Sequence, residues 1–284
     1  MRSLAPPYQA SIASADVEII VVDNGSTIPV EPGWFDGTKS PIRILRFPPG
    51  NASPCAGLNA GVGAASHPTI AVLIDGARMA SPGLLRQALA ASRLANDVFV
   101  ATMGFHLGPD TQQKSQANGY SAEAEDRLLA QIDWFANGYR LFDISVRGES
   151  YQDGVLSDFP ETTAFVMRKA TFQRIGGFHE GFRYRGGGLA NFDFYERVFE
   201  DEAITPVMLI GEGTFHQVHD GNTTRPGGVA RREVPGGLTI WEAMAREFTE
   251  ITGREPLATP LRKPLLFGHC SSSAAENLFF ASEN

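Results

Sequence analysis

Three segments of this sequence end an apolar run with side chains that could bind an anion or a metal. Asp23 follows "VEIIVV", Asp75 follows "TIAVLI", and "GTFHQVH" places His216 and His219 three residues apart. Carboxylate oxygens accept hydrogen bonds from ribose hydroxyls and bind hard divalent cations, and an added imidazole favours Mn²⁺ over Mg²⁺. These residue types indicate a site for a small or metal-paired anion.

The composition restricts the partners and the compartment. The 284 residues carry a formal net charge of −8 without clustered Lys and Arg, so no nucleic-acid partner is expected. The two cysteines, Cys55 and Cys270, form no CxxC pair, which argues against a zinc ribbon or a disulfide framework. No window is apolar enough for a transmembrane helix, and the N-terminus lacks the layout of a signal peptide. We expect a soluble protein of the cytoplasm.

The order of the apolar segments predicts the elements that position these side chains. Helices alternate with buried strands, which are expected over 17–23, 41–47, 69–75, 97–103, 162–169 and 206–219. Ser81 and Pro82 are the predicted N-cap and first residue of one of these helices. The alternation predicts an α/β fold with a mainly parallel central sheet, whose ligands bind at the carboxyl ends of the strands, where Asp23 and Asp75 lie.

Four motifs in this order resemble the inverting family 2 glycosyltransferases of the GT-A fold. They are "EIIVVDNGST", "NASPCAGLNAGVGAA" leading to "AVLIDGA", "RIGGFHEGF" followed by "GGGLANFDFYER", and "GTFHQVH". The resemblance covers roughly residues 15–220, most of a main domain expected over 1–235. A C-terminal helix and extended tail, 236–284, are expected to pack on that domain. The resemblance implies transfer of a sugar from a nucleoside-diphosphate donor to a glycan hydroxyl, as in polysaccharide biosynthesis.

The resemblance assigns the donor side of the site. Asp23 and Asn24 would hold the nucleoside, and Asn51, Asn59 and Arg78 would complete the donor contacts. A carboxylate at a strand end can accept hydrogen bonds from ribose hydroxyls, which is the physical reason for that role. The alternative is an Asp-Asn-Gly turn that only closes the strand.

The metal-binding motif of the family is incomplete here. Asp75 matches the first acid of its D-x-D signature, whose cation bridges the donor diphosphate, but Ala77 replaces the second acid. His216 and His219 would complete the site for Mn²⁺ or Mg²⁺. Two alternatives remain open: a histidine pair on the surface, and a guanidinium, Arg78, that offsets the diphosphate charge without a metal.

The acceptor side is also altered. Inverting transfer needs a base that takes the proton of the acceptor hydroxyl, and Asp193 is the candidate that survives in the matching segment. Asn191 occupies the position expected for the base and, with Glu180, would bind the acceptor. The alternative for Asp193 is an i,i+4 ion pair with Arg197. The fallback acids near the same expected cleft are Glu180, Glu161 and Asp158.

Members of the family usually begin with one further central strand, which this chain, starting at "MRSLAPP", does not show. The resemblance therefore implies an N-terminally incomplete sheet. The rival function is a non-catalytic module that binds a nucleotide sugar or a glycan, which the lost acids favour. A nucleotidyltransferase ranks last, because the early glycine-rich phosphate loop is missing.

Overall fold

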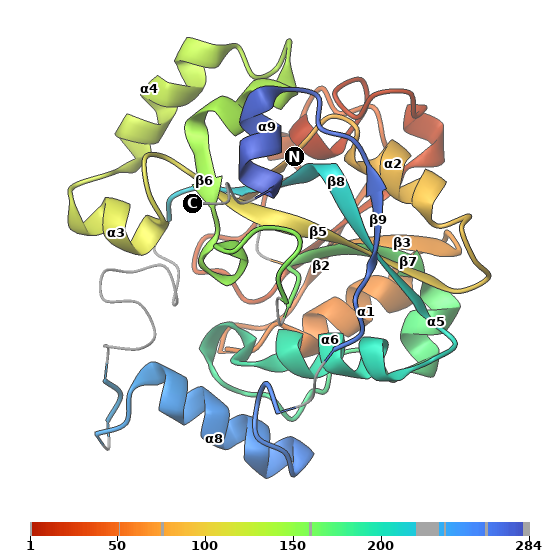
Figure 1. Ribbon diagram of the computed structural model, residues 1–284, viewed down its shortest axis with the longest axis vertical. Coiled ribbons are helices and arrows are strands. Elements are labelled where there is room, and N and C mark those ends of the chain that lie inside the picture. Colours follow the sequence, from red (N-terminus) through yellow and green to blue (C-terminus); the bar gives the residue numbers. More distant parts are fainter. Residues whose placement is uncertain are drawn as a thin grey trace.

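A central β-sheet with helices on both faces organises the chain (Figure 1), which confirms the predicted α/β class. The computed structural model describes residues 2–50, 52–74, 77–158, 161–219, 233–235, 237–258 and 261–280. The strands are β1 (Ile19–Asp23), β2 (Ile42–Arg46), β3 (Thr69–Leu73), β4 (Arg78–Ala80), β5 (Val98–Leu107), β6 (Ser145–Arg147), β7 (Ala164–Arg168), β8 (Thr205–His216) and β9 (Leu265–Gly268). The α-helices are α1 (Cys55–Ala64), α2 (Leu84–Ala91), α3 (Gln112–Ala117), α4 (Ala122–Ile132), α5 (Lys169–Arg174), α6 (Ala190–Glu200), α8 (Ile240–Thr252) and α9 (Ser273–Phe279).

Strand directions in the larger sheet are mixed, so the prediction of a mainly parallel sheet is wrong. The sheet order is β3-β7-β5-β8-β4, with β6 on β5 and β9 on β8. Among these described strands, only the β5–β8 and β8–β9 pairs are parallel. A strand that is buried on both faces shows the same apolar run in either direction, so the sequence pattern could not distinguish the two.

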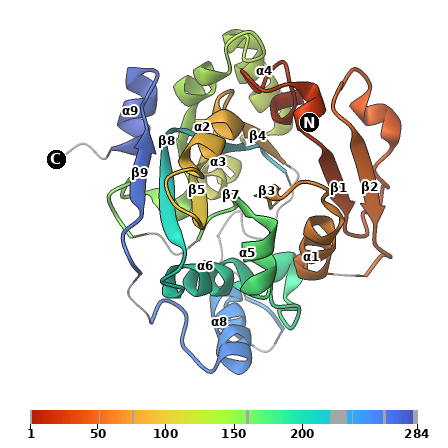
Figure 2. The ribbon, with the colours of Figure 1, turned by 90° about the vertical axis from the view of Figure 1, so that its right-hand side faces the viewer.

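A separate two-stranded sheet lies beside the larger one (Figure 2). Its strands β1 and β2 pair in parallel, and α1 packs against both β1 and β3. Residues 19–22 are half-buried, although their apolar run predicted a strand covered on both faces. The reason is that β2 is the only strand of the described ranges that pairs with β1. The N-terminally incomplete sheet implied by the family resemblance stays a prediction.

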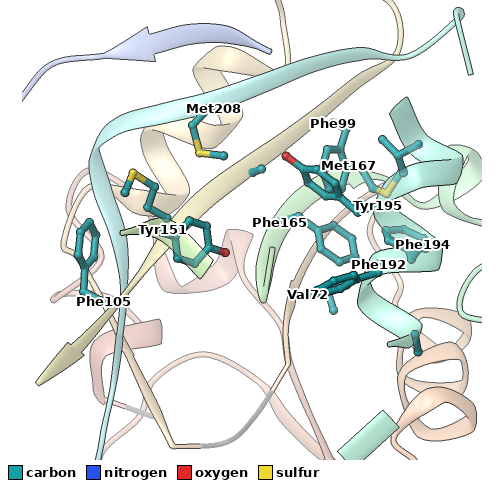
Figure 3. Packing of buried hydrophobic residues seen from close by; sticks show 14 of the residues in the cluster. Val72, Phe99, Phe105, Tyr151, Phe165, Met167, Phe192, Phe194, Tyr195 and Met208 are labelled. Atoms are coloured by element: carbon teal, nitrogen blue, oxygen red, sulfur yellow. The ribbon is translucent and has the colours of Figure 1, made fainter. Parts of the chain in front are cut away.

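Two apolar layers hold helices on the larger sheet. On one face, the alanines of α2 pack against Val and Leu side chains of β5, β7 and β8. On the other face, aromatic rings of α6 pack against β5 and β7 (Figure 3): the ring centroids of Phe165 and Phe194 lie 5.1 Å apart, and those of Phe99 and Tyr195 lie 5.9 Å apart. Such ring pairs add about 0.5–1.5 kcal/mol each to their area burial. They fix α6, and with it Asn191 in its first turn, relative to the sheet.

The C-terminal segment contributes to the main core. α8 packs on α6, and a capping box of Thr239 and Glu242 fixes its amino end. β9 pairs with β8, and α9 packs against the 3₁₀ helix η4 (Gly138–Ile144). The domain boundary at residue 235 stays a prediction.

A buried carboxylate, Glu212 of β8, organises the turn between β4 and α2. It accepts hydrogen bonds from the Ser81 hydroxyl at 2.5 Å, the Tyr139 hydroxyl at 2.7 Å and the Gly83 amide at 3.2 Å. Burial raises the pKa of Glu212 above its usual range, and these donors oppose the shift. Ser81 is therefore not the predicted N-cap: Gly83 precedes α2, and no side chain caps the helix.

The N-terminal segment is tied to the same turn. The Tyr8 hydroxyl donates to the carbonyl of Ala80 at 2.8 Å, and Gln9 Nε2 donates to the carbonyl of Ser81 at 2.9 Å. Gln9 Oε1 accepts the amide of Leu85 at 3.1 Å. Tyr8 and Gln9 are both buried. These bonds hold β4 and the start of α2 in place.

Substituting Gly83→Ala is expected to lower the free energy of unfolding by at least about 2 kcal/mol, because the core has no room for a methyl group there. A Cβ at this position would lie 2.2 Å from Glu212 Oε1 and 2.5 Å from Tyr139 Oη, so the bond between these two side chains must break. Gly33→Ala is the control, because its Cβ would come no closer than 4.0 Å to any neighbouring side chain. Urea denaturation measures both, and equal stability of the two variants would contradict the prediction.

Candidate functional site

Polar side chains from three strands meet where β8 ends. β4 pairs with β8 so that Arg78 lies opposite His216, and β5 pairs with β8 so that His106 also lies opposite His216. Within β8, Gly211 has a φ of +79°, a conformation that side chains rarely adopt, and the register between β5 and β8 shifts nearby. The structure thus brings together two predicted site residues, Arg78 and His216.

Gln112, the first residue of α3, fixes the tautomer of His216. Its Nε2 donates to the carbonyl of His216 at 2.9 Å, and its Oε1 lies 2.7 Å from His216 Nδ1. Because an amide oxygen only accepts, we assign the imidazole proton to Nδ1, which leaves a lone pair on Nε2. His219 Nε2 lies 3.0 Å from that atom, so with this tautomer His219 Nε2–H donates the hydrogen bond and His216 Nε2 accepts it. The predicted histidine pair therefore converges at its two Nε2 atoms, and His216 is buried.

His106 is a third histidine of this cluster that the sequence analysis missed. Its Nδ1 accepts the amide of Gln112 at 3.0 Å. Burial, with His216 and Arg78 nearby, lowers the pKa of His106 to about 3, so the ring is neutral at pH 7. Because His106 lies within an apolar strand, its sequence context is that of an ordinary core residue. Only its register opposite His216 reveals its place in the site.

Arg78 begins β4 three residues after Asp75, which lies outside the described residues. The Nε of Arg78 donates to the carbonyl of Ile74 at 3.2 Å. Burial raises the pKa of Tyr151 above its usual range, the charge of Glu161 raises it further, and the charge of Arg78 opposes both. The Tyr151 hydroxyl donates to the Glu161 carbonyl at 3.2 Å, so Glu161 lies beside this tyrosine.

Glu161 lies at the end of the segment that leads into β7. Its Oε1 accepts from the Ser150 hydroxyl at 2.8 Å, and its Oε2 accepts from Asn191 Nδ2 at 3.3 Å. Its backbone carbonyl accepts the Tyr151 hydroxyl at 3.2 Å. The side chain is half-buried. Asn191, which was predicted to bind the acceptor, thus contacts the carboxylate of Glu161, which was predicted only as a fallback acid.

Asp193, the predicted base, lies in a buried ion pair. Its Oδ2 accepts from Arg197 Nε at 3.0 Å and from Arg197 Nη2 at 2.7 Å. The same guanidinium donates to the carbonyls of Ile175 and Gly177. The structure therefore contains the i,i+4 pair that the alternative interpretation predicted, and this pair joins α6 to the end of α5. The catalytic role of Asp193 stays a prediction.

Asp23 closes a turn with both of its carboxylate oxygens. Oδ1 accepts the amide of Ser26 at 2.9 Å, and Oδ2 accepts the amide of Val30 at 3.1 Å. These hydrogen bonds, that from Ser26 above all, lower the pKa of Asp23 below its usual range. Asn24 Nδ2 donates to the carbonyl of Ser53 at 3.0 Å. The turn interpretation of "DNG" is thus present in the structure, and nucleoside binding by Asp23 and Asn24 stays a prediction.

Two other predicted ligands bind each other. Asn59 Nδ2 donates to the carbonyl of Phe178 and to Glu180 Oε1, each at 2.9 Å, and its Oδ1 accepts the amide of Phe178 at 2.9 Å. These bonds clamp α1 to the segment after α5. The third predicted asparagine, Asn51, lies outside the described residues. Donor binding by Asn51 and Asn59 and acceptor binding by Glu180 stay predictions.

The two imidazoles contact each other through a hydrogen bond of 3.0 Å between their Nε2 atoms. Gln112 orients the His216 ring through its Nδ1–H. Metal binding by the pair stays a prediction. Within the described ranges no cluster of three or more His, Cys, Asp or Glu side chains could hold a metal ion. A carboxylate ligand would therefore have to come from elsewhere, as predicted for Asp75.

Two surface hollows lie outside this site. One, of about 640 Å³, is lined by Pro68, Thr69, residues 92–96, Val98, Met167 and Arg168, at the amino ends of β3 and β5. The other, of about 380 Å³, lies beside Arg147 and the carboxyl end of α9. Neither contains a predicted site residue. None of the helices in the described part of the chain is long and apolar enough to cross a membrane.

Comparisons with known proteins give structural similarities but no sequence match. No protein-family model matches the sequence. No curated protein matches it either. The structure is similar to S. aureus TarS 1–349 in complex with UDP-GlcNAc, with a TM-score of 0.48 and 11% identity over 85% of this chain and 60% of that chain. For the complex with UDP the TM-score is 0.42, with 12% identity over 75% of this chain and 52% of that chain. The chain thus spans roughly half to three fifths of those structures, and similarity at this level does not establish a family.

Substituting Asp193→Ala is expected to lower the free energy of unfolding by about 2–4 kcal/mol, because Arg197 would keep a charge in a largely buried place without its partner. Glu250→Ala is the matched control: it removes the acid of another i,i+4 pair, with Arg246, that is exposed, and should cost less than about 0.5 kcal/mol. Chemical denaturation at pH 7 measures both. Equal effects would show that the Asp193 pair does not stabilise the fold.

The protein is expected to lose stability as the pH falls below 6.5, in part because of His106. The folded ring keeps a pKa of about 3, whereas an unfolded histidine titrates near 6.5, so acid protonates the unfolded chain first. Between pH 7 and pH 5 the loss from this one group is about 2 kcal/mol. His106→Asn, whose Oδ1 can still accept the Gln112 amide, should remove that part of the pH dependence. Identical slopes for variant and wild type would contradict this.

Proposed function

We propose that this chain transfers a sugar from a nucleoside-diphosphate donor to the hydroxyl of a glycan or another acceptor, with inversion at the anomeric carbon. The observation that supports this best is that Arg78, His216 and His219 lie together at the end of β8. Arg78 also follows Asp75 by three residues in the sequence. A guanidinium and imidazoles suit the charge that grows on a departing diphosphate. The half-buried pair of Glu161 and Asn191 offers an acid and an amide for a hydroxyl acceptor.

In this proposal the roles of the residues follow from their contacts. Arg78 binds diphosphate oxygens, and its placement comes from the pairing of β4 with β8. Asn24 and Asn59 lie on the β1 and α1 side and border the nucleoside. Asp193 is not given a catalytic role here, because its Oδ2 is bound by Arg197. Its contribution is to hold α6, which carries Asn191.

His216, His219 and Asp75 would hold a divalent cation, Mn²⁺ or Mg²⁺. When bound, the cation would offset the charge of the diphosphate. Gln112 would keep His216 in the tautomer whose Nε2 is free of a proton. To bind the same ion, His219 would first have to lose the Nε2 proton that it donates to His216.

The second candidate is a non-catalytic module that binds a nucleotide sugar or a glycan. It is favoured by the internal bonds of Asp23 and Asp193, since both carboxylates predicted for donor and base are bound to the protein itself. The two functions differ in one property. A transferase releases nucleoside diphosphate from its donor, and a binding module does not.

A panel of UDP-, GDP- and dTDP-sugars, with and without Mn²⁺, distinguishes the two candidates. We expect release of nucleoside diphosphate from at least one donor, slowly to water and faster when a hydroxyl acceptor is added. Binding of a nucleotide without release would support the module. Neither binding nor release with any donor would contradict both candidates.

Substituting His216→Ala is expected to weaken nucleoside-diphosphate binding at least about tenfold in the presence of Mn²⁺ and to leave binding in EDTA unchanged. Because His216 is buried, His219→Ala is measured beside it as a variant with less effect on packing. The control is His67→Ala, an exposed histidine before β3. Calorimetric titration measures the affinities. If all three variants bind like wild type in Mn²⁺, the histidine pair is not a metal site.

A further inference from the structure

We infer that Glu161 is the base that accepts the proton of the attacking hydroxyl; this rests on the proposed sugar transfer. The inference starts from a comparison of the acids near the site. Each acid is judged by what already occupies its oxygens, because a base must have an oxygen that a substrate hydroxyl can reach.

Three of the four acids are bound in ways that do not suit a base. Asp193 accepts two bonds from Arg197 on one oxygen and is buried. Asp158 forms an ion pair with Lys263 at 2.6 Å, and its side chain is 70% exposed. Glu180 is exposed and accepts a hydrogen bond from the side-chain amide of Asn59. A cation on a carboxylate weakens it as a proton acceptor, and full exposure gives no defined position.

Glu161 differs from these acids in its partners. Its two oxygens accept from neutral donors, the Ser150 hydroxyl at 2.8 Å and the Asn191 amide at 3.3 Å, and no salt bridge of the described residues includes it. Each carboxylate oxygen has two lone pairs, so each keeps one for a substrate hydroxyl. Its half-buried side chain is held in place and still open to solvent.

The position of Glu161 relative to Arg78 supports the same role. Glu161 lies beside Tyr151, whose hydroxyl donates to the Glu161 carbonyl at 3.2 Å. A base must stand near the anomeric carbon while the cationic group stands by the leaving diphosphate, so the mechanism requires the two groups close together but not paired with each other. A Cβ at Gly104 would lie 3.1 Å from the Tyr151 ring and 3.5 Å from the Arg78 guanidinium, so the ring lies beside Arg78.

The step balances as follows. The acceptor oxygen attacks the anomeric carbon, and its proton passes to a carboxylate oxygen of Glu161. The bond between that carbon and the diphosphate oxygen breaks, and its electron pair leaves with the nucleoside diphosphate. Glu161 then returns the proton to solvent. Asn191 orients the carboxylate through its amide and is a positioning residue.

The test compares Glu161→Gln with wild type, using the sugar nucleotide that wild type turns over fastest. Release of nucleoside diphosphate should fall at least about 100-fold, while the dissociation constant of that nucleoside diphosphate should change less than about twofold. Asp158→Asn, on the same segment, is the matched control and should keep full turnover. Because Gln has the shape of Glu, thermal unfolding should show both variants folded.

A pH profile separates a base from a structural residue. Asn191→Asp would put a second carboxylate beside Glu161 and should move the low-pH decline of the rate to higher pH, since neighbouring like charges disfavour ionisation. If Glu161→Gln keeps more than half of the wild-type turnover, or Asp193→Asn stays folded and alone abolishes it, Glu161 is not the base although sugar transfer stands. If wild type binds no nucleoside diphosphate, the proposed function and this inference are both overturned.

Discussion

The site depends on β8 pairing with two strands at once. In its last residues β8 is hydrogen-bonded to β5 in parallel and to β4 in the antiparallel direction, so His216 has His106 on one side and Arg78 on the other. β4 has three residues and could not hold this place alone. It is kept there by the buried network of Glu212, Ser81 and Tyr139 and by the N-terminal segment. The position of Arg78 therefore depends on the buried hydrogen bonds that hold β4 in place.

The acids of this chain differ in whether their carboxylates are buried and already bound by other groups of the protein. A buried carboxylate must be paired or hydrogen-bonded, and Asp23 and Asp193 meet that demand with backbone amides and a guanidinium. Both contribute to structure, by closing the turn after β1 and by joining α6 to α5. The chemistry proposed for this chain rests instead on the histidine pair and on Glu161.

The sequence predicted the strands and helices better than their arrangement. β1, β2, β3, β5, β7 and β8 overlap the ranges that their apolar residues predicted, since such a pattern depends on the local sequence alone. It could not give strand direction, the three-residue strand β4, or the exposure of β1, because these depend on partners that are distant in the chain. His106 and Gln112 escaped notice for the same reason: a histidine in an apolar strand and a glutamine in a polar loop gain meaning only through contact with His216. The pairing of Asp193 with Arg197 was open to prediction because it is local.

A crystal structure of the protein with Mn²⁺ and the nucleoside diphosphate that binds most tightly would test the central claim most directly. The account predicts an anomalous manganese peak in bonding contact with His216 Nε2, and diphosphate oxygens within hydrogen-bonding distance of the Arg78 guanidinium. A diphosphate bound at the other end of the strands, in the hollow beside Arg93 and Arg168, with Arg78 and His216 untouched, would contradict it.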